Sequence, residues 1–409
     1  MNRFLTLTSI FCAGLALLSV VWIVIPAPHS YVWLYSVAVS EWSLWFGALA
    51  LAGMLLALAN YAFYRSGRAA AVALVLGACA LLISLYPWLT ARSAAREKQI
   101  SLSLVEYFAG LSGGEPNAQP QTYVFRPGGE TSLKMDVYAP PENVRSRGAG
   151  VVVIHGGSWS GGTRSDFPQW NRWLAANGYT VFDIDYTLAP QPNYLTAVGD
   201  VKCAVRQIKK RSREFNISPD KIVLLGRSAG AHLALTAAYS TGDAQLPPTC
   251  AEAQNVENQA NAENAENDQS VRAVISFYAP TDLVWAYDHP ANQFVIDGPQ
   301  TIADFIGGSP HESVEIAARY ALASPVERAG ANSPPTLLLH GGQDQLVRPE
   351  NLERLAEKLK QNNIRRETVL IPYAQHGFDY NFHGWGSQLA RSMILDFLDE
   401  NTGGEKRKE

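Results

Sequence analysis

Gly226-Arg227-Ser228-Ala229-Gly230 stands directly after the apolar run 222–225 and directly before the helix-forming residues 231–235. The pattern Gly-x-Ser-x-Gly between a strand and a helix is typical of a nucleophile elbow, a sharp turn that exposes a serine hydroxyl. Its two glycines lack side chains, which lets the strand and the helix approach each other closely. The first turn of the helix also presents free backbone N–H groups beside the serine oxygen. The sequence therefore predicts an α/β fold in which Ser228 is a nucleophile.

Residues 121–400 alternate short β-branched runs with polar helical stretches, and this alternation indicates one α/β catalytic domain. We expect a mostly parallel, twisted sheet of about eight strands with helices on both faces. The expected strands are residues 121–126, 134–138, 150–155, 179–185, 221–226, 271–277, 335–340 and 367–372. The expected helices are residues 167–177, 197–215, 229–239, 349–361 and 388–400.

Four stretches outside these elements have a different character. Residues 251–269 are rich in Asn, Ala and Glu with almost nothing else apolar, so we expect a disordered insertion there. Residues 283–323 carry several aromatic side chains and are predicted to form a cap over the site, with a plain covering of the sheet as the alternative. Residues 100–120 are expected to be a linker and residues 401–409 a charged tail.

A serine hydroxyl is a weak nucleophile at neutral pH, so Ser228 needs a base and a carboxylate that orients this base. His376 stands in a short loop after the last expected strand, where such folds carry their base. Asp344 follows the next-to-last strand, at the sheet edge where ligands bind in open α/β sheets. Asp282 follows the preceding strand and is the alternative carboxylate, although it also fits a helix N-cap. The sequence thus predicts a triad of Ser228, Asp344 and His376.

The negative oxygen of an acyl-transfer intermediate needs backbone N–H donors close to the serine. Gly156 and Gly157 follow the strand 150–155, in a loop that can approach the elbow closely. Ala229, the residue after the nucleophile, would supply another N–H group. A phosphate-binding loop is the competing interpretation, but the pattern Gly-x-x-x-x-Gly-Lys-Ser/Thr is absent from the sequence. The candidates for a substrate pocket are His155, Trp159 and Trp285, with simple packing as the alternative for Trp159.

Residues 1–99 are predicted to form a membrane segment with three transmembrane helices. Residues 4–26, 42–64 and 69–90 contain no Asp, Glu, Lys or Arg, and each exceeds the roughly 20 residues that cross a bilayer core. A cleaved secretory signal is the alternative for the first span, but its apolar region is longer than the roughly 7 to 15 residues typical of such signals. We therefore expect an integral membrane protein.

Two features of the sequence bear on which side of the membrane carries the catalytic domain. Basic residues do not decide it, because arginines at positions 3, 65 and 68 favour one orientation and the basic residues of 92–98 favour the other. Cys203 and Cys250 either form a disulfide bond or remain two free thiols, and a bond would favour an oxidising compartment. We expect the catalytic domain on the periplasmic or extracellular side.

The sequence argues against a nucleic-acid-binding protein and against a metalloprotein. The chain of 409 residues has a formal net charge of -4, and no stretch is dominated by basic side chains, which argues against nucleic-acid binding. No cluster of His, Asp or Glu has metal-ligand spacing and no Cys-x-x-Cys pair is present. We therefore predict no metal and no cofactor.

Residues 121–400 resemble the α/β-hydrolase superfamily, most nearly its esterase branch related to hormone-sensitive lipase and to bacterial feruloyl esterase-like (BD-FAE) proteins. The patterns that carry this resemblance are His155-Gly156-Gly157-Ser158-Trp159, Asp185-Tyr186-Thr187-Leu188-Ala189-Pro190, Gly226-Arg227-Ser228-Ala229-Gly230, and the loops of Asp344 and His376. Ser158 replaces a third glycine and Thr187 replaces an arginine that are usual in the lipase-like branch. The resemblance implies a carboxylesterase or lipase-like serine hydrolase.

The expected activity is hydrolysis of small or lipid-like carboxylic esters through an acyl-enzyme. The expected partners are this ester substrate and the membrane; protein partners do not follow from the sequence. A peptidase of the acylaminoacyl type uses the same triad and is one alternative. The other is a non-catalytic protein that binds a ligand through the same fold, although such a protein has no chemical need for a complete triad.

Overall fold

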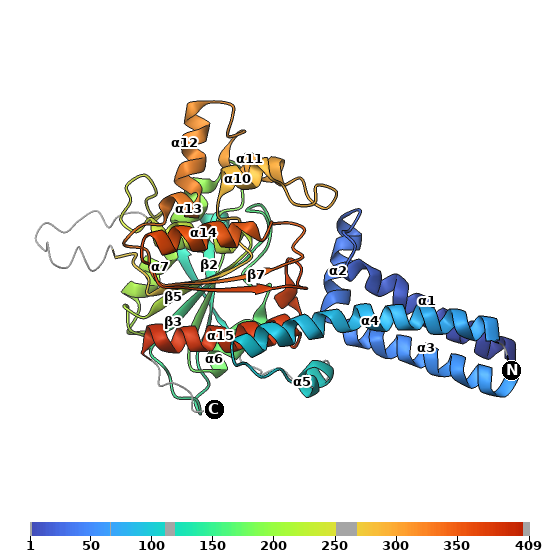
Figure 1. Ribbon diagram of the computed structural model, residues 1–409. Helices are drawn as coiled ribbons and strands as arrows, with labels where there is room; N and C mark the ends of the chain where they lie inside the picture. Colours follow the sequence, from blue (N-terminus) through green and yellow to red (C-terminus); the bar gives the residue numbers. More distant parts are fainter. Residues whose placement is uncertain (1, 66, 111–118, 251–267, 404–409) are drawn as a thin grey trace, which may run out of the picture.

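The computed structural model describes residues 2–65, 67–110, 119–250 and 268–403, and it has two parts (Figure 1). Long N-terminal helices form a bundle on one side, and a twisted sheet flanked by helices forms the other. Most of the predicted insertion 251–269 and of the predicted tail 401–409 lies outside the described residues, as do positions 111–118 of the predicted linker.

The sheet has eight strands in the order β1-β2-β4-β3-β5-β6-β7-β8. Their bounds are Gln121–Arg126 (β1), Leu133–Tyr138 (β2), Gly150–Ile154 (β3), Thr180–Ile184 (β4), Ile222–Arg227 (β5), Ala273–Phe277 (β6), Thr336–Gly341 (β7) and Arg366–Ile371 (β8). The pairs β1–β2 and β2–β4 are antiparallel, and all other neighbouring pairs are parallel. The predicted mostly parallel α/β-hydrolase sheet is therefore confirmed.

Alternate residues of the parallel strands point to opposite faces, and each face is covered by its own helices. In β3, for example, Val152 packs in the cluster beneath α7 (Tyr194–Lys210), α8 (Ala229–Tyr239) and α14 (Glu350–Gln361), whereas Val153 packs in the cluster of the opposite face. That second face carries α6 (Pro168–Ala176) and α15 (Trp385–Thr402) (Figure 1). Because strands such as β3 and β5 are buried on both faces, their sequences are continuous apolar runs and do not alternate with polar residues.

Residues 283–323, the predicted cap, form three helices between β6 and β7: α10 (Leu283–Asp288), α11 (Gly298–Ile306) and α12 (Val314–Ala323). They stand together on the same side of the sheet as α14, above it in the view of Figure 1, and are followed by the short α13 (Pro325–Arg328).

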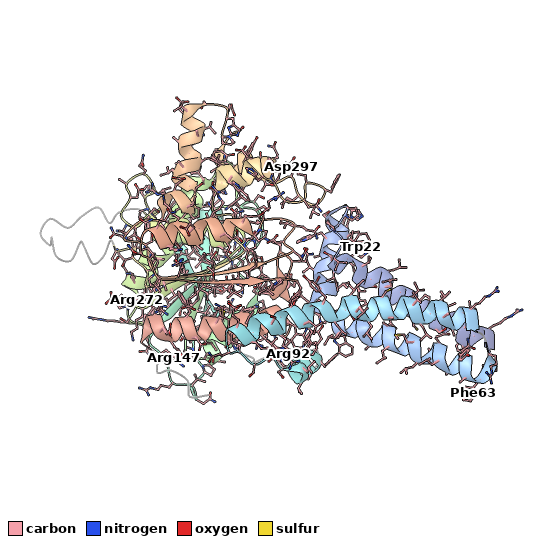
Figure 2. All side chains as sticks on the ribbon, in the orientation of Figure 1. Trp22, Phe63, Arg92, Arg147, Arg272 and Asp297 are labelled. Carbon is pink, nitrogen blue, oxygen red and sulfur yellow. A yellow bond between two sulfur atoms is a disulfide. The ribbon has the colours of Figure 1, made fainter. Side chains whose placement is uncertain are left out.

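The N-terminal part contains α1 (Asn2–Val20), the 3-10 turn η1 (Val21–Ile23), α2 (Ser30–Glu41), α3 (Ser43–Tyr64) and α4 (Gly67–Glu97). Three of these segments, Arg3–Ile23, Ser43–Tyr64 and Gly67–Glu97, are long and apolar enough to cross a membrane. Trp22 lies at the end of the bundle near the sheet, and Phe63 lies at the far end (Figure 2).

Two elements of this region differ from the sequence-based expectation. The helix α4 continues beyond the predicted end of the third span, because the charged side chains after Thr90 end the apolar run without ending the helix. The helix α2 was not predicted as a separate element, and the ring of His29 caps it by accepting a hydrogen bond from the Val32 N–H at 3.4 Å.

The bundle and the catalytic domain share buried contacts. Ala91 and Ala95, near the end of α4, belong to the same core cluster as Trp385 of α15. Tyr107, in the short helix α5 (Leu104–Ala109) that falls in the predicted linker, stacks on Trp385 with ring centroids 4.2 Å apart. Its hydroxyl accepts a hydrogen bond from the Leu44 N–H at 3.2 Å, so the start of α3 is also attached here.

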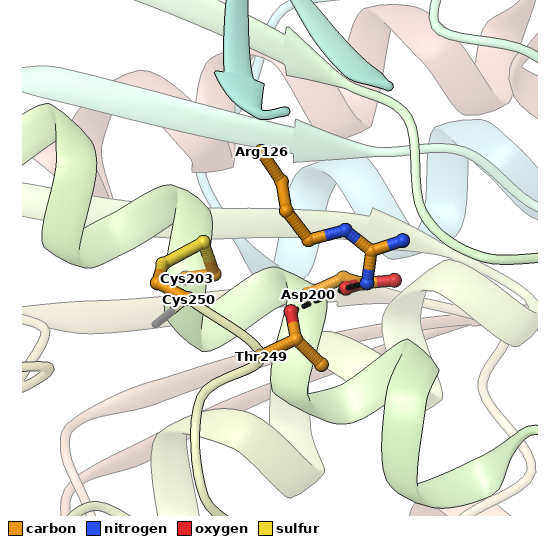
Figure 3. The surroundings of a disulfide bond; sticks show 5 residues. All are labelled: Arg126, Asp200, Cys203, Thr249 and Cys250. Atoms are coloured by element: carbon orange, nitrogen blue, oxygen red, sulfur yellow. Dashed lines mark hydrogen bonds and ion pairs between the residues drawn. A yellow bond between two sulfur atoms is a disulfide. The ribbon is translucent and has the colours of Figure 1, made fainter. Parts of the chain in front are cut away.

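Cys203 and Cys250 form a disulfide bond, with Cα atoms 5.3 Å apart (Figure 3). Of the two alternatives that the sequence left open, the structure thus has the bridge. It fixes the loop after α8 to the buried helix α7. Next to it, the Asp200 carboxylate accepts hydrogen bonds from Arg126 and Thr249, each at 2.5 Å, and these contacts hold the same loop (Figure 3).

Candidate active site

Ser228 occupies the turn between β5 and α8 with φ 52° and ψ −121°, a conformation that is strained for a residue with a side chain. The two neighbouring glycines explain how this turn fits. A Cβ on Gly226 would lie 2.3 Å from the Gly230 carbonyl oxygen, and a Cβ on Gly230 would lie 2.2 Å from the His155 carbonyl oxygen. The Ser228 N–H donates to the Phe277 carbonyl at 2.9 Å, which fixes the turn to β6.

The three predicted triad side chains form one hydrogen-bonded chain. His376 Nε2 lies 2.9 Å from Ser228 Oγ, and His376 Nδ1 lies 2.7 Å from Asp344 Oδ2. A carboxylate can only accept, so Nδ1 carries the proton and Nε2 is free to accept the serine proton. The residues follow the C-terminal ends of β5, β7 and β8, which the parallel register places at one edge of the sheet.

Asp344 is held as an ionised carboxylate. Its side chain is fully buried, and burial alone would raise its pKa; the neighbouring His376 and His340 outweigh this effect and hold the pKa below its usual range. Its other oxygen, Oδ1, accepts the Leu346 and Val347 N–H groups at 2.8 and 2.9 Å. These bonds fix the orientation of the carboxylate toward His376.

Asp282, the alternative carboxylate, has a different environment. Its side chain accepts the Trp285 N–H at 3.0 Å and caps α10. It also forms an ion pair with Arg354 at 2.6 Å. The structure therefore places Asp282 in the N-cap role that its sequence context allowed, and not beside His376.

Of the predicted oxyanion donors, Gly156 lies beside Ser228, and Ala229 follows it directly in the chain. A Cβ on Gly156 would lie 3.3 Å from the Ser228 Cβ, so this loop passes directly beside the nucleophile. Gly157 has φ 113°, and a Cβ there would lie 2.2 Å from the Gly161 carbonyl oxygen. Within the described part of the chain, the N–H groups of Gly156, Gly157 and Ala229 have no hydrogen-bond acceptor. Such free donors beside a nucleophile are suited to bind a developing oxyanion.

A mostly apolar pocket that is open to solvent reaches Ser228. Its lining comes from the oxyanion loop, from the segment between α10 and α11, and from the loop after Asp344; it includes Ser158, Trp159, Ala229, Ala291, Ile296, Ile302, Leu346 and Val347. Of the three predicted pocket residues, Trp159 lines this cavity.

His155 and Trp285 do not line the cavity, in contrast to the sequence-based prediction. The His155 ring stacks on Tyr186 at 4.4 Å, and its Nδ1 lies 2.7 Å from the Gly156 carbonyl oxygen, so it supports the oxyanion loop from behind. The Trp285 ring stacks on His289 at 4.9 Å and lies against Arg354. Burial lowers the pKa of His155 and favours its neutral form.

His232 connects the oxyanion loop to the cap, a role that the sequence did not indicate. Its Nδ1 accepts the Trp159 Nε1–H at 3.2 Å, and its Nε2 donates to the Ala323 carbonyl at 2.9 Å. The Trp159 ring also stacks on Phe305 of α11, with centroids 4.3 Å apart. Burial lowers the pKa of His232 to about 4, which keeps the ring neutral and able to make both bonds.

Arg227, the residue before the nucleophile, forms a buried ion pair with Asp379 at 2.5 Å. Asp379 belongs to the same loop as His376 and also accepts the Tyr278 O–H at 2.5 Å. The pair therefore ties the elbow to the histidine loop. No local sequence signal identifies it, because the two residues are far apart in the chain and only the fold brings them together.

In the part of the chain that the structure describes, no group of three or more His, Cys, Asp or Glu side chains could hold a metal ion. The groups near Ser228 are of the kinds that acyl transfer uses: a serine, an imidazole, a buried carboxylate and free backbone N–H groups.

Known proteins share this architecture. Esterase LipQ of Mycobacterium tuberculosis is 27% identical over 285 residues, covering 69% of this chain and 62% of that protein. The probable carboxylic ester hydrolase LipM of the same organism is 28% identical over 257 residues, covering 60% of this chain and 53% of that protein. The chain thus spans less than two thirds of the length of these relatives.

A solved structure of Thermogutta terrifontis esterase 2 phosphonylated by sarin is 23% identical, covers 72% of this chain and 99% of its own, and has a TM-score of 0.55. The paraoxon-phosphorylated form of that esterase is 22% identical, with coverages of 72% and 98% and a TM-score of 0.53. These likenesses show the α/β-hydrolase fold. The BD-FAE family model matches residues 135–359, and the chain therefore belongs to the BD-FAE family.

Proposed function

We propose that this protein is a membrane-anchored carboxylic ester hydrolase that acts through an acyl-enzyme on Ser228. The observation that carries the proposal is the hydrogen-bonded chain from Ser228 Oγ through the His376 ring to the Asp344 carboxylate. The esterase relatives from Mycobacterium tuberculosis support the reaction class.

In the first half of the reaction, His376 Nε2 takes the hydroxyl proton while Ser228 Oγ attacks the ester carbonyl carbon. The Gly156, Gly157 and Ala229 N–H groups stabilise the negative oxygen of the tetrahedral intermediate. Collapse of this intermediate breaks the bond to the alcohol, which leaves with the proton from His376. Asp344 stabilises the transient imidazolium without taking its proton.

In the second half, water replaces the alcohol. His376 takes a proton from the water as its oxygen attacks the acyl carbon, and then returns a proton to Ser228 Oγ when the carboxylic acid leaves. No group besides the triad, the N–H donors and water is needed for these steps.

We propose small or lipid-like esters as substrates. The cavity at Ser228 is lined mainly by aliphatic side chains and by Trp159, which suits an acyl chain. We also propose that the three long apolar helices anchor the protein in a membrane. The Cys203–Cys250 bond supports a periplasmic or extracellular position of the catalytic domain, because disulfide bonds persist in oxidising compartments.

The test is a Ser228→Ala variant of the full chain in detergent, with p-nitrophenyl esters of increasing acyl length. Removal of the nucleophile should lower kcat on the order of 10⁴ to 10⁶-fold. Thermogutta terrifontis esterase 2 is phosphorylated by paraoxon, so a fluorophosphonate probe should label the wild-type protein and not the variant. Wild-type turnover by the variant would contradict the proposal. A wild-type protein that the probe does not label would indicate a binding protein instead.

A further inference from the structure

The segment between the first span and α2 contacts the loop that carries Asp344. The Ala27 N–H donates to the Gln345 side-chain oxygen Oε1 at 2.7 Å. Ala27 is 2% exposed and Gln345 is partly buried. Gln345 directly follows Asp344 in the sequence, which places an N-terminal backbone group one residue away from the triad carboxylate.

The same glutamine reaches the second catalytic loop. Its amide nitrogen Nε2 donates to Gln375 Oε1 at 3.1 Å. Gln375 directly precedes His376 and is 2% exposed. A chain of hydrogen bonds therefore runs from Ala27 through Gln345 to Gln375 and touches the immediate neighbours of both Asp344 and His376.

Asn292 closes this chain into a ring from the pocket side. Its Nδ2 donates to the Ala27 carbonyl at 2.6 Å and to Gln345 Oε1 at 2.9 Å, and its N–H donates to the Gln345 carbonyl at 3.0 Å. Asn292 lies between α10 and α11, next to Ala291 of the cavity wall. Both polar groups of the Ala27 backbone are thus used by the catalytic domain.

The N-terminal part makes a second contact with the loop that carries His376. Glu41, at the end of α2, lies with Oε2 3.4 Å from the Tyr373 hydroxyl, and its carbonyl accepts the Asn381 Nδ2–H at 3.3 Å. Tyr373 and Asn381 lie before and after His376 in the chain. The N-terminal part therefore holds the loop of the base on both sides.

We propose that the N-terminal segment completes the active site, with Gln345 and Gln375 as positioning residues that transmit its contact to Asp344 and His376. The proposal rests on the proposed triad function. Its physical basis is the sensitivity of acyl transfer to geometry, since a displacement of about 1 Å in a catalytic group can cost about 100-fold in rate. The backbone donor at Ala27 and the amide of Gln345 fix two loops that carry different triad members.

The test uses the full chain in detergent with a Gln345→Leu substitution, which keeps a similar volume and removes the three side-chain hydrogen bonds to Ala27, Asn292 and Gln375. We expect kcat for p-nitrophenyl acetate to fall about 10 to 100-fold, with KM changed less than about 2-fold, because the substrate cavity is retained. The rate of fluorophosphonate labelling should fall in parallel. Gln361→Leu is the matched control: this exposed glutamine on α14 donates to Glu357 at 3.3 Å, away from the site, and its loss should leave kcat unchanged.

Comparing kcat of Gln375→Leu and of the double variant with that of Gln345→Leu distinguishes a positioning role from a merely structural one. If both side chains act through their shared hydrogen bond, the double variant should lose no more kcat than the stronger single variant. Asn292→Ala removes the outer link while sparing the glutamine pair, and it should give a smaller fall in kcat. It also keeps the test open if Gln345→Leu does not fold.

Wild-type kcat and labelling rate in a folded Gln345→Leu protein would overturn the inference. Independent losses that multiply in the double variant would overturn it too. Failure of the triad itself has a different signature, since Ser228→Ala would then retain activity or the wild-type protein would escape the fluorophosphonate probe.

Discussion

The two parts of the molecule bury opposite kinds of side chains. In the catalytic domain, the largest fully buried residues include Trp170, Phe182 and Phe277. In the helical bundle, the buried positions are mostly alanine, glycine and serine, whereas large apolar side chains such as Phe4 and Phe11 are 70% and 66% exposed.

The proposed membrane anchoring of the bundle accounts for this difference. Water drives large apolar side chains into the core of the catalytic domain. A bilayer gives no such drive, and helices then associate through close contact of small residues. A Cβ on Gly53 of α3 would lie 2.8 Å from the Ala13 backbone nitrogen of α1, so these helices touch at the backbone. This packing through small residues supports the proposed membrane anchoring of the bundle.

The largest effect should come from a matched pair of phenylalanine truncations. Phe182→Ala empties a fully buried site in β4 and should destabilise the catalytic domain by about 3 to 5 kcal/mol. Phe11→Ala, at an exposed site of α1, should change stability in detergent by less than about 0.5 kcal/mol. Chemical unfolding followed by tryptophan fluorescence measures both. Equal losses in the two variants would contradict the contrast between the two interiors.

A smaller effect should appear as a pH dependence confined to the catalytic domain. Burial lowers the pKa of His232 from 6.5 to about 4, so the unfolded chain binds this proton more readily than the folded one. The stability that neutral His232 provides is complete above pH 6.5 and is lost as the pH falls toward 4, by about 3 kcal/mol. Residues 4–26, 42–64 and 69–90 of the three apolar spans contain no histidine or acidic residue and should not respond.

His232→Gln isolates this contribution, because a glutamine amide can accept from Trp159 and donate to the Ala323 carbonyl without titrating in this range. The free energy of unfolding of this variant should fall less steeply between pH 7 and pH 4 than that of the wild type. Identical slopes for the two proteins would show that His232 is not the titrating group.

The smallest of the three effects should come from adding volume to the bundle. Gly53→Leu forces a side chain against the Ala13 nitrogen and the Ser9 carbonyl, and should weaken the α1–α3 contact by about 1 to 3 kcal/mol. Gly14→Ala is the control, because no atom lies within 4 Å of the added Cβ. Denaturation of the full chain in detergent should distinguish the stabilities of these two variants. A Gly53→Leu protein as stable as the control would argue against backbone contact between these helices.

Local patterns were sufficient to predict the fold and the candidate triad. The glycines beside Ser228 predict the nucleophile elbow. The uninterrupted length of the apolar segments predicts the spans. Asp344 and His376 could be chosen because parallel strands deliver their C-terminal ends to a single edge of the sheet. These signals all lie within a few residues of the feature that they predict.

The rest depends on contacts between distant parts of the chain. No local sequence pattern predicts three of these contacts, because only the folded chain brings their members together. They are the Arg227–Asp379 ion pair, the Cys203–Cys250 disulfide bond and the hydrogen bond from Ala27 to Gln345. The same holds for the pocket residues. His155 and Trp285 were chosen from the sequence, but their rings stack on Tyr186 and His289 and are not among the side chains that line the cavity at Ser228.

The helix α4 belongs to both parts of the molecule. Ala73 and Ala80 pack in the bundle, and Ala91 and Ala95 of the same unbroken helix pack in the core of the catalytic domain. Spanning helices adjust their tilt to the thickness of the surrounding bilayer. If the bundle spans a bilayer as we propose, a change in the tilt of α4 would turn the catalytic domain with it and change the angle at which the cavity faces the membrane surface.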